Sequence, residues 1–310
     1  MKKPSKILFH RDYRGFQGGH LKLYDYINHV DSVDWLQSEV FVDPASRGDH
    51  LWSNHAHLVE SFQPAAANIL FIAGTDWRAL NPFGGIEEQM PVINLIQGFN
   101  HTQPKHELFS YLHRKAIRIC VSQEVAVAVK QTGLCHGPIH TIENGIDLSL
   151  LPLPPIHQEG ILIAGLKNPE LAKSLCDRLR QHSIEVECLT SHIPRSVYLE
   201  KLSKRRIAVT LPKKTEGFYL PALEAMAMGL AVVCPDCVGN RSFCRDGLTC
   251  LMPDMDLQSL EAATLRLIKD TDLSQRLRAN ALAQSRLHSI EKERGLFLDL
   301  MRRILEDPLT

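Results

Sequence analysis

Short, continuous apolar runs alternate with stretches of helical spacing along both halves of this chain. In the first half the apolar runs cover residues 6–10, 38–42, 68–73, 92–97 and 117–122. Because polar residues do not alternate with apolar ones in these runs, they predict strands that are buried on both faces of a parallel sheet. Helical spacing predicts helices between the strands, over residues 19–30, 106–115 and 123–132.

The second half repeats this alternation. Strands are expected over residues 161–165, 185–189, 207–211 and 231–234, with a short one over 250–252. Helices are expected over residues 169–182, 196–204 and 221–228, and from 257 onward with a boundary near 270–273. Alternating strands and helices in both halves predict two doubly wound α/β domains.

A proline-rich segment, residues 148–160, has no helical period and is interpreted as the connection between the domains. We therefore expect an N-terminal domain over residues 1–150 and a C-terminal domain over 151–290. The last helix, residues 291–310, either crosses back to the N-terminal domain or packs on its own domain.

Charge and composition exclude several classes of protein. The chain has 35 Lys and Arg and 35 Asp and Glu, so it lacks the basic excess that nucleic-acid binding needs. No apolar run approaches the roughly 18 residues of a membrane span, and the N-terminal segment does not have the pattern of a signal peptide. We expect a cytoplasmic location, with peripheral contact to the inner face of the membrane left open.

The eight cysteines permit two interpretations. Without a signal peptide, a disulfide framework is not expected. Cys234, Cys237, Cys244 and Cys250 could form a zinc site, because one pair has ligand spacing, or they could pack in the core. The core interpretation is preferred, and no metal is expected.

The most informative segment is residues 215–256, which follows the strand expected at 207–211. Gly217 permits close backbone approach, and Pro221 suits the first turn of a helix. The free N–H groups and dipole of that helix favour phosphate, and Glu216 and Glu224 can accept hydrogen bonds from sugar hydroxyls. From spacing alone, a capped amphipathic helix that only packs is an equal alternative.

Residues 216–227 read EGFYLPALEAMA, and Gly229, Val232–Val233, Gly239 and Asp246–Gly247 follow at matching intervals. This pattern closely resembles the donor-binding region of the retaining GT-B glycosyltransferases, in the large nucleotide-sugar family of group 1 glycosyl transferases (family four-like). Weaker similarity covers CVSQEVAVAV, IENGIDLSLLP and the Gly18–Gly19 pair. The resemblance implies a GT-B fold, with two Rossmann-like domains facing across a cleft.

The resemblance also implies roles. Glu224 would bind the ribose hydroxyls, and Glu216 would contact the donor sugar near the reacting centre. Backbone groups are expected to approach the donor sugar and diphosphate at Gly18, Gly19, Gly217, Phe218, Tyr219 and Leu220. The reaction would move a sugar from a UDP- or GDP-sugar to a carbohydrate or glycoconjugate hydroxyl with retention, in cell-envelope polysaccharide or glycoconjugate synthesis. No cofactor besides this co-substrate is expected.

Three departures from the family pattern affect the site. Leu166 and Leu171 occupy the positions of an Arg and a Lys that bind the diphosphate in the family. Lys167 or Lys213 could replace them, or both could be surface residues. The family often has a histidine in its N-terminal domain, after the strand expected here at 92–97. In this chain either Gln97 or His101 could supply its contact with the donor sugar. Tyr219 replaces the family's usual glycine in the donor loop.

Weaker candidates for acceptor or phosphate contacts follow strands of the first half, and they are Arg14, His20, Asp76 and Trp77. Two other functions stay open because of the altered diphosphate contacts. One is a sugar-nucleotide epimerase or a phosphorylase. The other is a catalytically degenerate GT-B protein that binds a nucleotide or a partner without turnover.

Overall fold

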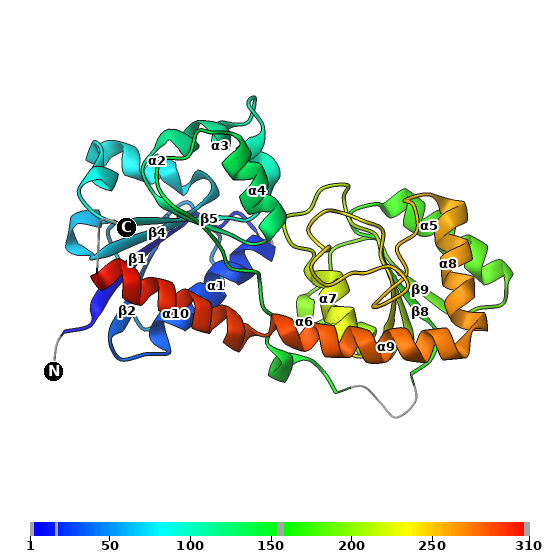
Figure 1. Cartoon of the computed structure of the whole chain (residues 1–310). Helices are drawn as coiled ribbons and strands as arrows, with labels where there is room; N and C mark the ends of the chain where they lie inside the picture. The colour runs from blue at the N-terminus through cyan, green and yellow to red at the C-terminus, as the bar shows by residue number, and fades with distance from the viewer. Residues whose placement is uncertain (1–2, 16–17, 154–157, 307–310) are drawn as a thin grey trace. The chain divides into compact units, whose positions relative to one another are not determined.

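The computed structural model describes residues 3–15, 18–153 and 158–306, and the chain divides into two compact units (Figure 1). Unit 1 comprises Met1–Asn144 and Glu293–Thr310, and unit 2 comprises Gly145–Lys292. Each unit has its own parallel sheet, which confirms the expected pair of Rossmann-like domains. Part of the proline-rich connection, residues 154–157, lies outside the described residues.

Unit 1 contains a seven-stranded parallel sheet in the order β3-β2-β1-β4-β5-β6-β7. The strands are β1 (Ser5–Arg11), β2 (Leu36–Val42), β3 (Leu58–Val59), β4 (Ile69–Ala73), β5 (Val92–Ile96), β6 (Ile117–Cys120) and β7 (Ile139–Thr141). The five predicted strands are confirmed. The edge strands β3 and β7 were not predicted, because both are very short and lack a buried apolar run. In this doubly wound order the strand order reverses between β1 and β4, which is where such sheets bind ligands.

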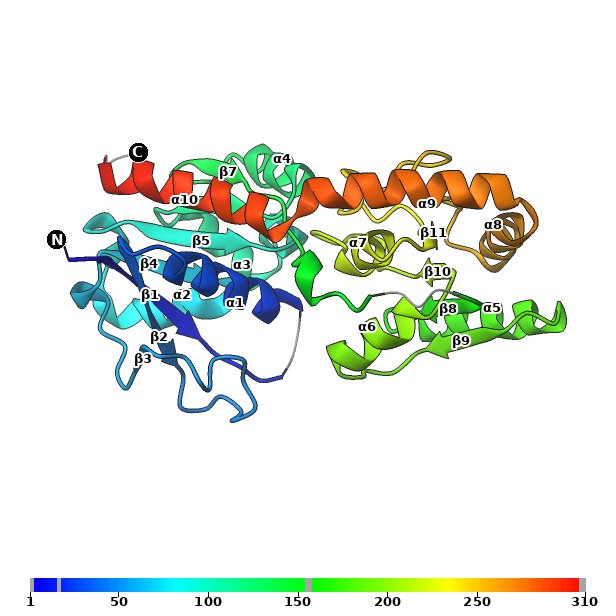
Figure 2. The same ribbon diagram turned by 90° about the horizontal axis from the view of Figure 1, so that it is seen from below.

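The helices of unit 1 are α1 (Gly18–Asp31), α2 (Trp77–Leu80), α3 (Glu107–Ser110), α4 (Gln123–Gln131) and α10 (Ile290–Glu306). Helix α10 packs along α1, and Figure 2 shows the two side by side. The rings of Tyr26 and Phe297 meet edge to face at 5.0 Å, and Lys22 Nζ lies 2.6 Å from Glu293 Oε2. Both apolar and ionic contacts therefore hold the C-terminal helix in unit 1.

The helix predicted over residues 106–115 is mostly absent. Only the four residues of α3 are α-helical, followed by a 3-10 turn over Tyr111–His113. The wholly buried Arg118 side chain explains the difference, because its guanidinium donates to the carbonyls of Leu112 (2.9 Å) and Arg114 (2.6 Å). Because these carbonyls accept hydrogen bonds from Arg118, they are not available to continue a helix, and the segment forms a loop around the guanidinium. The local sequence does not show that Arg118 is buried.

Unit 2 contains a four-stranded parallel sheet in the order β11-β10-β8-β9. The strands are β8 (Ile161–Ala164), β9 (Val186–Leu189), β10 (Ile207–Thr210) and β11 (Ala231–Val233). The helices are α5 (Pro169–Gln181), α6 (Arg195–Ser203), α7 (Leu220–Ala227), α8 (Leu257–Lys269) and α9 (Thr271–Ser285). Here the strand order reverses between β8 and β10, which marks a second candidate ligand position.

The prediction of a strand over residues 250–252 is wrong. Leu251 forms a single bridge with Val233 and does not continue a ladder. The nearby thiols of Cys234, Cys244 and Cys250 are buried in the apolar core beneath α7, as the packing interpretation expected. Within the described ranges, no group of three or more His, Cys, Asp or Glu residues has an arrangement that could hold a metal ion.

No helix in the described part of the chain has both the length and the apolar character needed to cross a bilayer. The cytoplasmic location and the peripheral membrane contact stay predictions from the sequence.

Candidate functional site

The loops after β8 and β10 bring three of the predicted donor residues of unit 2 together. Lys167 follows β8, and Lys213 and Glu216 follow β10, so all three lie at the reversal of strand order. Lys167 Nζ lies 2.7 Å from Glu216 Oε2, and the backbone N–H of Lys213 donates to Glu216 Oε1 at 2.9 Å. The Lys167 ammonium also lies 5.3 Å from the centre of the Tyr219 ring. A carboxylate, a lysine ammonium and a backbone N–H therefore meet at this reversal point.

Backbone hydrogen bonds fix the loop from Glu216 to Leu220 against a second loop. The N–H of Glu216 donates to Cys237 O at 2.9 Å, and the N–H of Tyr219 donates to Gly239 O at 3.0 Å. A Cβ on Gly239 would lie 2.3 Å from Glu216 O, so only glycine permits this approach. The Tyr219 N–H is thus already bonded, which corrects its predicted contact with the donor.

Helix α7 begins at Leu220, where its dipole and unpaired N–H groups favour an anion. Within residues 158–306, the N–H groups of Phe218 and Leu220 have no hydrogen-bond acceptor. They remain candidates for the predicted diphosphate contact. The ring of Tyr219, in contrast, is buried in the core, and burial raises the pKa of its hydroxyl well above the usual value.

Glu224 lies in α7 and is almost completely buried. Its Oε1 accepts a hydrogen bond from Arg195 Nη2 of α6 at 2.6 Å. Burial raises the pKa of the Glu224 carboxyl, and the Arg195 guanidinium opposes that rise. The hydroxyl of Tyr198 is buried beside this carboxyl and has no hydrogen-bond partner in the described chain. These three side chains form a largely buried polar cluster whose groups can bond to hydroxyls.

In unit 1 the structure places Gln97 beside the predicted glycine pair. Gln97 follows β5, and its Nε2 donates to Gly19 O at 3.3 Å in the first turn of α1. A Cβ on Gly19 would lie 3.1 Å from the same nitrogen, which leaves little room for a side chain. Gly18 is the first residue of the helix. The N-terminus of α1 and the end of β5 therefore meet at the carboxyl edge of the sheet.

His101 is buried in the short 3-10 turn Phe99–Thr102 after β5. Neither ring nitrogen has a hydrogen-bond partner within the described residues. Burial, with a smaller contribution from the Arg118 charge, lowers the pKa of His101 to about 4. The ring is therefore neutral at physiological pH and could donate or accept one hydrogen bond to a ligand that reaches it.

A buried ion pair occupies the reversal point between β1 and β4. Arg11 ends β1, and its Nη1 donates to Asp76 Oδ2 at 2.8 Å. The other guanidinium nitrogen lies 3.2 Å from Nδ1 of His20, in the first turn of α1. Burial and the Arg11 charge lower the pKa of His20 to about 4. Asp76 also accepts from His10 and from the Ala73 N–H, so this buried carboxylate orients Arg11.

The other two weak candidates lie away from this cluster. Trp77 is completely buried and packs against the Tyr111 ring and the Arg114 guanidinium, which leaves no ring face for a ligand. Arg14 is exposed and donates to Ala45 O at 2.6 Å. The structure thus places His20 and Asp76 at the carboxyl edge and corrects the contact expected for Trp77.

Two residues of the site were missed in the sequence. Arg195 and Tyr198 lie on α6, before β10 in the chain, and nothing in their spacing connects them to Glu224.

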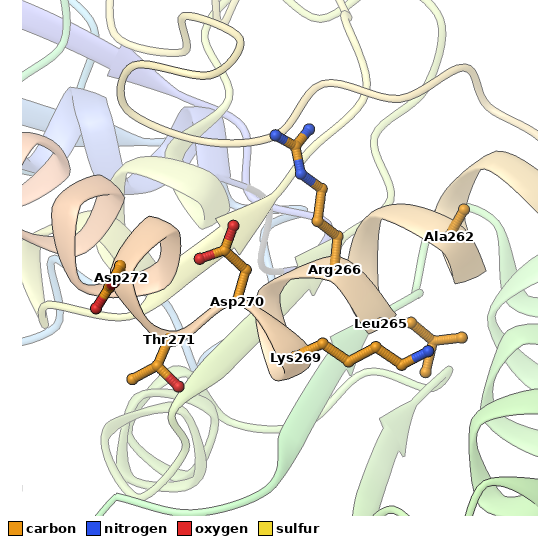
Figure 3. A pocket seen from close by; sticks show the side chains of 7 residues that line it. All are labelled: Ala262, Leu265, Arg266, Lys269, Asp270, Thr271 and Asp272. Carbon is orange, nitrogen blue, oxygen red and sulfur yellow. The ribbon is translucent and has the colours of Figure 1, made fainter.

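A separate hollow of about 760 Å³ lies at the junction of α8 and α9 (Figure 3). Its lining, which includes Arg266 and Lys269, contains none of the predicted donor residues.

Residues 130–270 match the family described as glycosyl transferases group 1. That segment, a little under half of the chain, is therefore similar to group 1 glycosyl transferases. It includes both glutamates, both lysines and Arg195. The structure as a whole has the GT-B type of fold, with one Rossmann-like sheet in each unit.

Comparison with individual proteins supports this assignment. The D-inositol 3-phosphate glycosyltransferase of Nocardioides sp. is 32% identical over 144 residues, which cover 45% of this chain and 31% of that protein. The match therefore spans only about a third of the relative's length. Sucrose-phosphate synthase from Thermosynechococcus elongatus aligns with a TM-score of 0.75 and 13% identity, over 97% of this chain and 99% of that one. The structure of Anabaena Alr3699/HepE in complex with UDP-glucose aligns with a TM-score of 0.74 and 17% identity, over 96% of this chain and 99% of that one.

Proposed function

We propose that this protein is a retaining glycosyltransferase that moves a sugar from a nucleoside-diphosphate sugar, with UDP or GDP as the nucleotide, to an acceptor hydroxyl. The acceptor is a carbohydrate or glycoconjugate, and the product belongs to cell-envelope polysaccharide or glycoconjugate synthesis. Retention and the envelope role rest on the resemblance of residues 216–227 to the retaining family. The complex of Alr3699/HepE with UDP-glucose supports a UDP-sugar as the donor.

The observation that carries the proposal is the ion pair of Lys167 with Glu216 at the reversal of strand order in unit 2, where the backbone N–H of Lys213 also bonds to Glu216. The family's own basic residues are replaced by leucines at 166 and 171, which raised the alternative of a degenerate protein. Lys167 approaches the site from the neighbouring loop and supplies a cation there. This lysine, which pairs with Glu216, supports the proposal that the chain supplies its own cation for the leaving diphosphate.

The transfer step depends on charge stabilisation and alignment. As the bond between the sugar and the diphosphate breaks, negative charge develops on the diphosphate. Lys167, Lys213 and the N-terminus of α7 would stabilise that charge, and this role requires no bound metal or further cofactor. Glu216, held by Lys167, would accept hydrogen bonds from donor-sugar hydroxyls and fix the orientation of the ring.

Glu224 would bind the ribose of the donor nucleotide. Its buried carboxyl is oriented by Arg195, and the free hydroxyl of Tyr198 offers a second hydrogen-bonding group. Two vicinal ribose hydroxyls can bond to such a carboxylate, which discriminates nucleotides from inorganic diphosphate. Replacing the carboxylate should therefore weaken nucleotide binding without changing the affinity of the lysines for diphosphate.

Thermal unfolding with UDP, GDP, ADP, TDP and CMP tests this proposal. A nucleotide present at about 100 times its Kd should stabilise the fold by about 2.7 kcal/mol, or several degrees in Tm. We expect one nucleoside diphosphate to shift Tm, and Glu224→Gln to abolish the shift. The matched control is Glu200→Gln, which removes an exposed carboxylate on α6 that pairs with Lys204.

A shift retained in Glu224→Gln would refute the role of that glutamate. No shift with any of the five nucleotides would favour the degenerate alternative. Turnover of a sugar nucleotide without an acceptor would indicate an epimerase instead.

A further inference from the structure

A polar cavity of about 490 Å³ lies on unit 1, outside the residues discussed above. Helix α1 contributes Tyr24, Asn28 and Asp31, the start of β2 contributes Leu36 and Gln37, and the rest of the lining comes from residues 51–57. Its volume falls within the range of small-molecule sites, about 300–1,000 Å³. The cavity is therefore large enough to hold one or two sugar units.

The cavity lies against the same face of α1 as His20, but further along the helix. His20, Tyr24 and Asn28 are spaced by four residues, and Asp31 follows three residues later, so all four lie on one side of α1. At 1.5 Å per residue, Asn28 lies about 12 Å along the helix axis from His20. His20 contacts Arg11 at the reversal of strand order but does not line the cavity, whose lining on α1 begins one helical turn further on, at Tyr24.

A set of hydrogen bonds makes the far end of the cavity rigid. The Asp31 carboxylate accepts from Ser38 N at 3.0 Å, from Ser38 Oγ at 2.7 Å and from His55 Nε2 at 3.0 Å. The His57 N–H donates to His55 Nδ1 at 3.1 Å, which fixes the segment that lines the cavity. Burial alone would raise the pKa of Asp31, but these hydrogen bonds outweigh it and lower the pKa.

The side chains that line the cavity and have no hydrogen-bond partner in the described residues indicate the chemistry of the ligand. The side chains of Tyr24, Asn28, Gln37 and Asn54 make no hydrogen bond within the described residues. An amide both donates and accepts, as a sugar hydroxyl does. No Lys or Arg lines the cavity, and its one carboxylate is already bonded. Leu36, Leu51 and the Tyr24 ring add apolar surface for the C–H faces of a sugar.

We propose that this cavity binds a neutral oligosaccharide, and that the acceptor of the reaction is such a chain. The acceptor's terminal hydroxyl would lie near His20, and units further along the chain would lie in the cavity. The inference rests on the proposed transferase function for its biological meaning, but saccharide binding can be measured without any donor. The lining favours a neutral ligand over a phosphorylated or carboxylated one, because it contains Asp31 and no Lys or Arg.

Isothermal titration of the full chain tests the proposal with four neutral tetrasaccharides: maltotetraose, cellotetraose, mannotetraose and tetra-N-acetylchitotetraose. The test variant is Asn28→Ala/Asn54→Ala, which removes two exposed amides of the cavity. Its matched control is Gln103→Ala/Gln131→Ala, which removes two exposed amides of unit 1 outside the cavity. Tetragalacturonate serves as the anionic comparison.

We expect at least one tetrasaccharide to bind and its affinity to fall about tenfold or more in the cavity variant, as two lost hydrogen bonds imply. The control variant and Glu224→Gln should bind it as the unaltered chain does. Failure of all four saccharides to bind, equal affinity in the cavity variant, or preferential binding of tetragalacturonate would overturn the proposal. Because the nucleotide-induced rise in Tm is measured separately, failure here is distinguishable from failure of the transferase assignment.

Discussion

Replacement of Arg195 by alanine should destabilise unit 2 in a pH-dependent way. The Arg195 and Glu224 side chains are 30% and 6% exposed and lie 2.6 Å apart. Removing one partner of a fully buried pair costs about 3–5 kcal/mol. Because Arg195 is partly exposed and solvent screens it, we expect a smaller loss of about 2–3 kcal/mol at pH 8. For a unit of this size, that loss lowers Tm by about 5–10 °C.

The sign of the pH dependence follows from the Glu224 carboxyl. Burial raises its pKa, and loss of Arg195 would raise it further. A raised carboxyl pKa favours the folded state at low pH, and this stabilisation is lost as pH rises through the folded-state pKa. The loss of unfolding free energy in Arg195→Ala should therefore be largest at pH 8. It should shrink towards pH 5, where the buried carboxyl can bind a proton.

Urea unfolding at pH 5 and pH 8 measures this effect. Adding Glu224→Gln to Arg195→Ala should recover most of the loss at pH 8, because no buried charge is then left unpaired. Lys204→Ala, which breaks an exposed pair on the same helix, should change stability by less than about 0.5 kcal/mol at either pH. An equal deficit at both pH values, or no recovery in the double variant, would refute the reasoning.

Three further predictions concern stability. Lys22→Met should lower the free energy of unfolding in urea by about 3–5 kcal/mol, because it removes the buried ammonium that pairs with Glu293 and Asp25 and leaves the Glu293 carboxylate with His29, and adding Glu293→Gln should recover part of the loss. Gly165→Ala should lower Tm, since its Cβ would lie 2.1 Å from the Cβ of Ala172; if Ala172→Gly does not recover part of the loss, the steric explanation fails. His101, with a pKa of about 4, binds its proton more weakly in the folded state, so stability should fall as pH drops from 6.5 to 4. His101→Gln should flatten that fall by up to about 3 kcal/mol, and an unchanged pH profile would contradict the lowered pKa.

The sequence predicted the parallel sheets because their strands are continuous apolar runs, a local property that tertiary contacts do not change. Of the eleven strands in the part of the chain that the structure describes, eight have more than three residues, and all of these were predicted. The position of Glu216 after β10 followed from the same alternation. Its contact with Lys167 required the fold, since the two residues lie 49 positions apart and meet only where β8 and β10 are neighbours.

The features that sequence reasoning missed depend on buried polar groups. A lysine and a glutamate at positions 22 and 293 look like ordinary surface residues, yet the structure buries both between α1 and α10. Arg118 resembles an exposed residue within a strand, but it lies in the core and ends the helix predicted before it. The pairing of Arg195 with Glu224 is equally invisible, because each side chain is satisfied by a residue distant in the chain.

Turnover of the donor is the most direct test of the central claim. The purified chain would be incubated with UDP- and GDP-sugars and with the neutral tetrasaccharide that binds it, and both nucleotide release and product linkage would be followed by NMR. We predict release of one nucleoside diphosphate and a product with the anomeric configuration of the donor, both abolished in Glu216→Gln. Donors that all stay intact, or a product of inverted configuration, would contradict the assignment of this chain as a retaining glycosyltransferase.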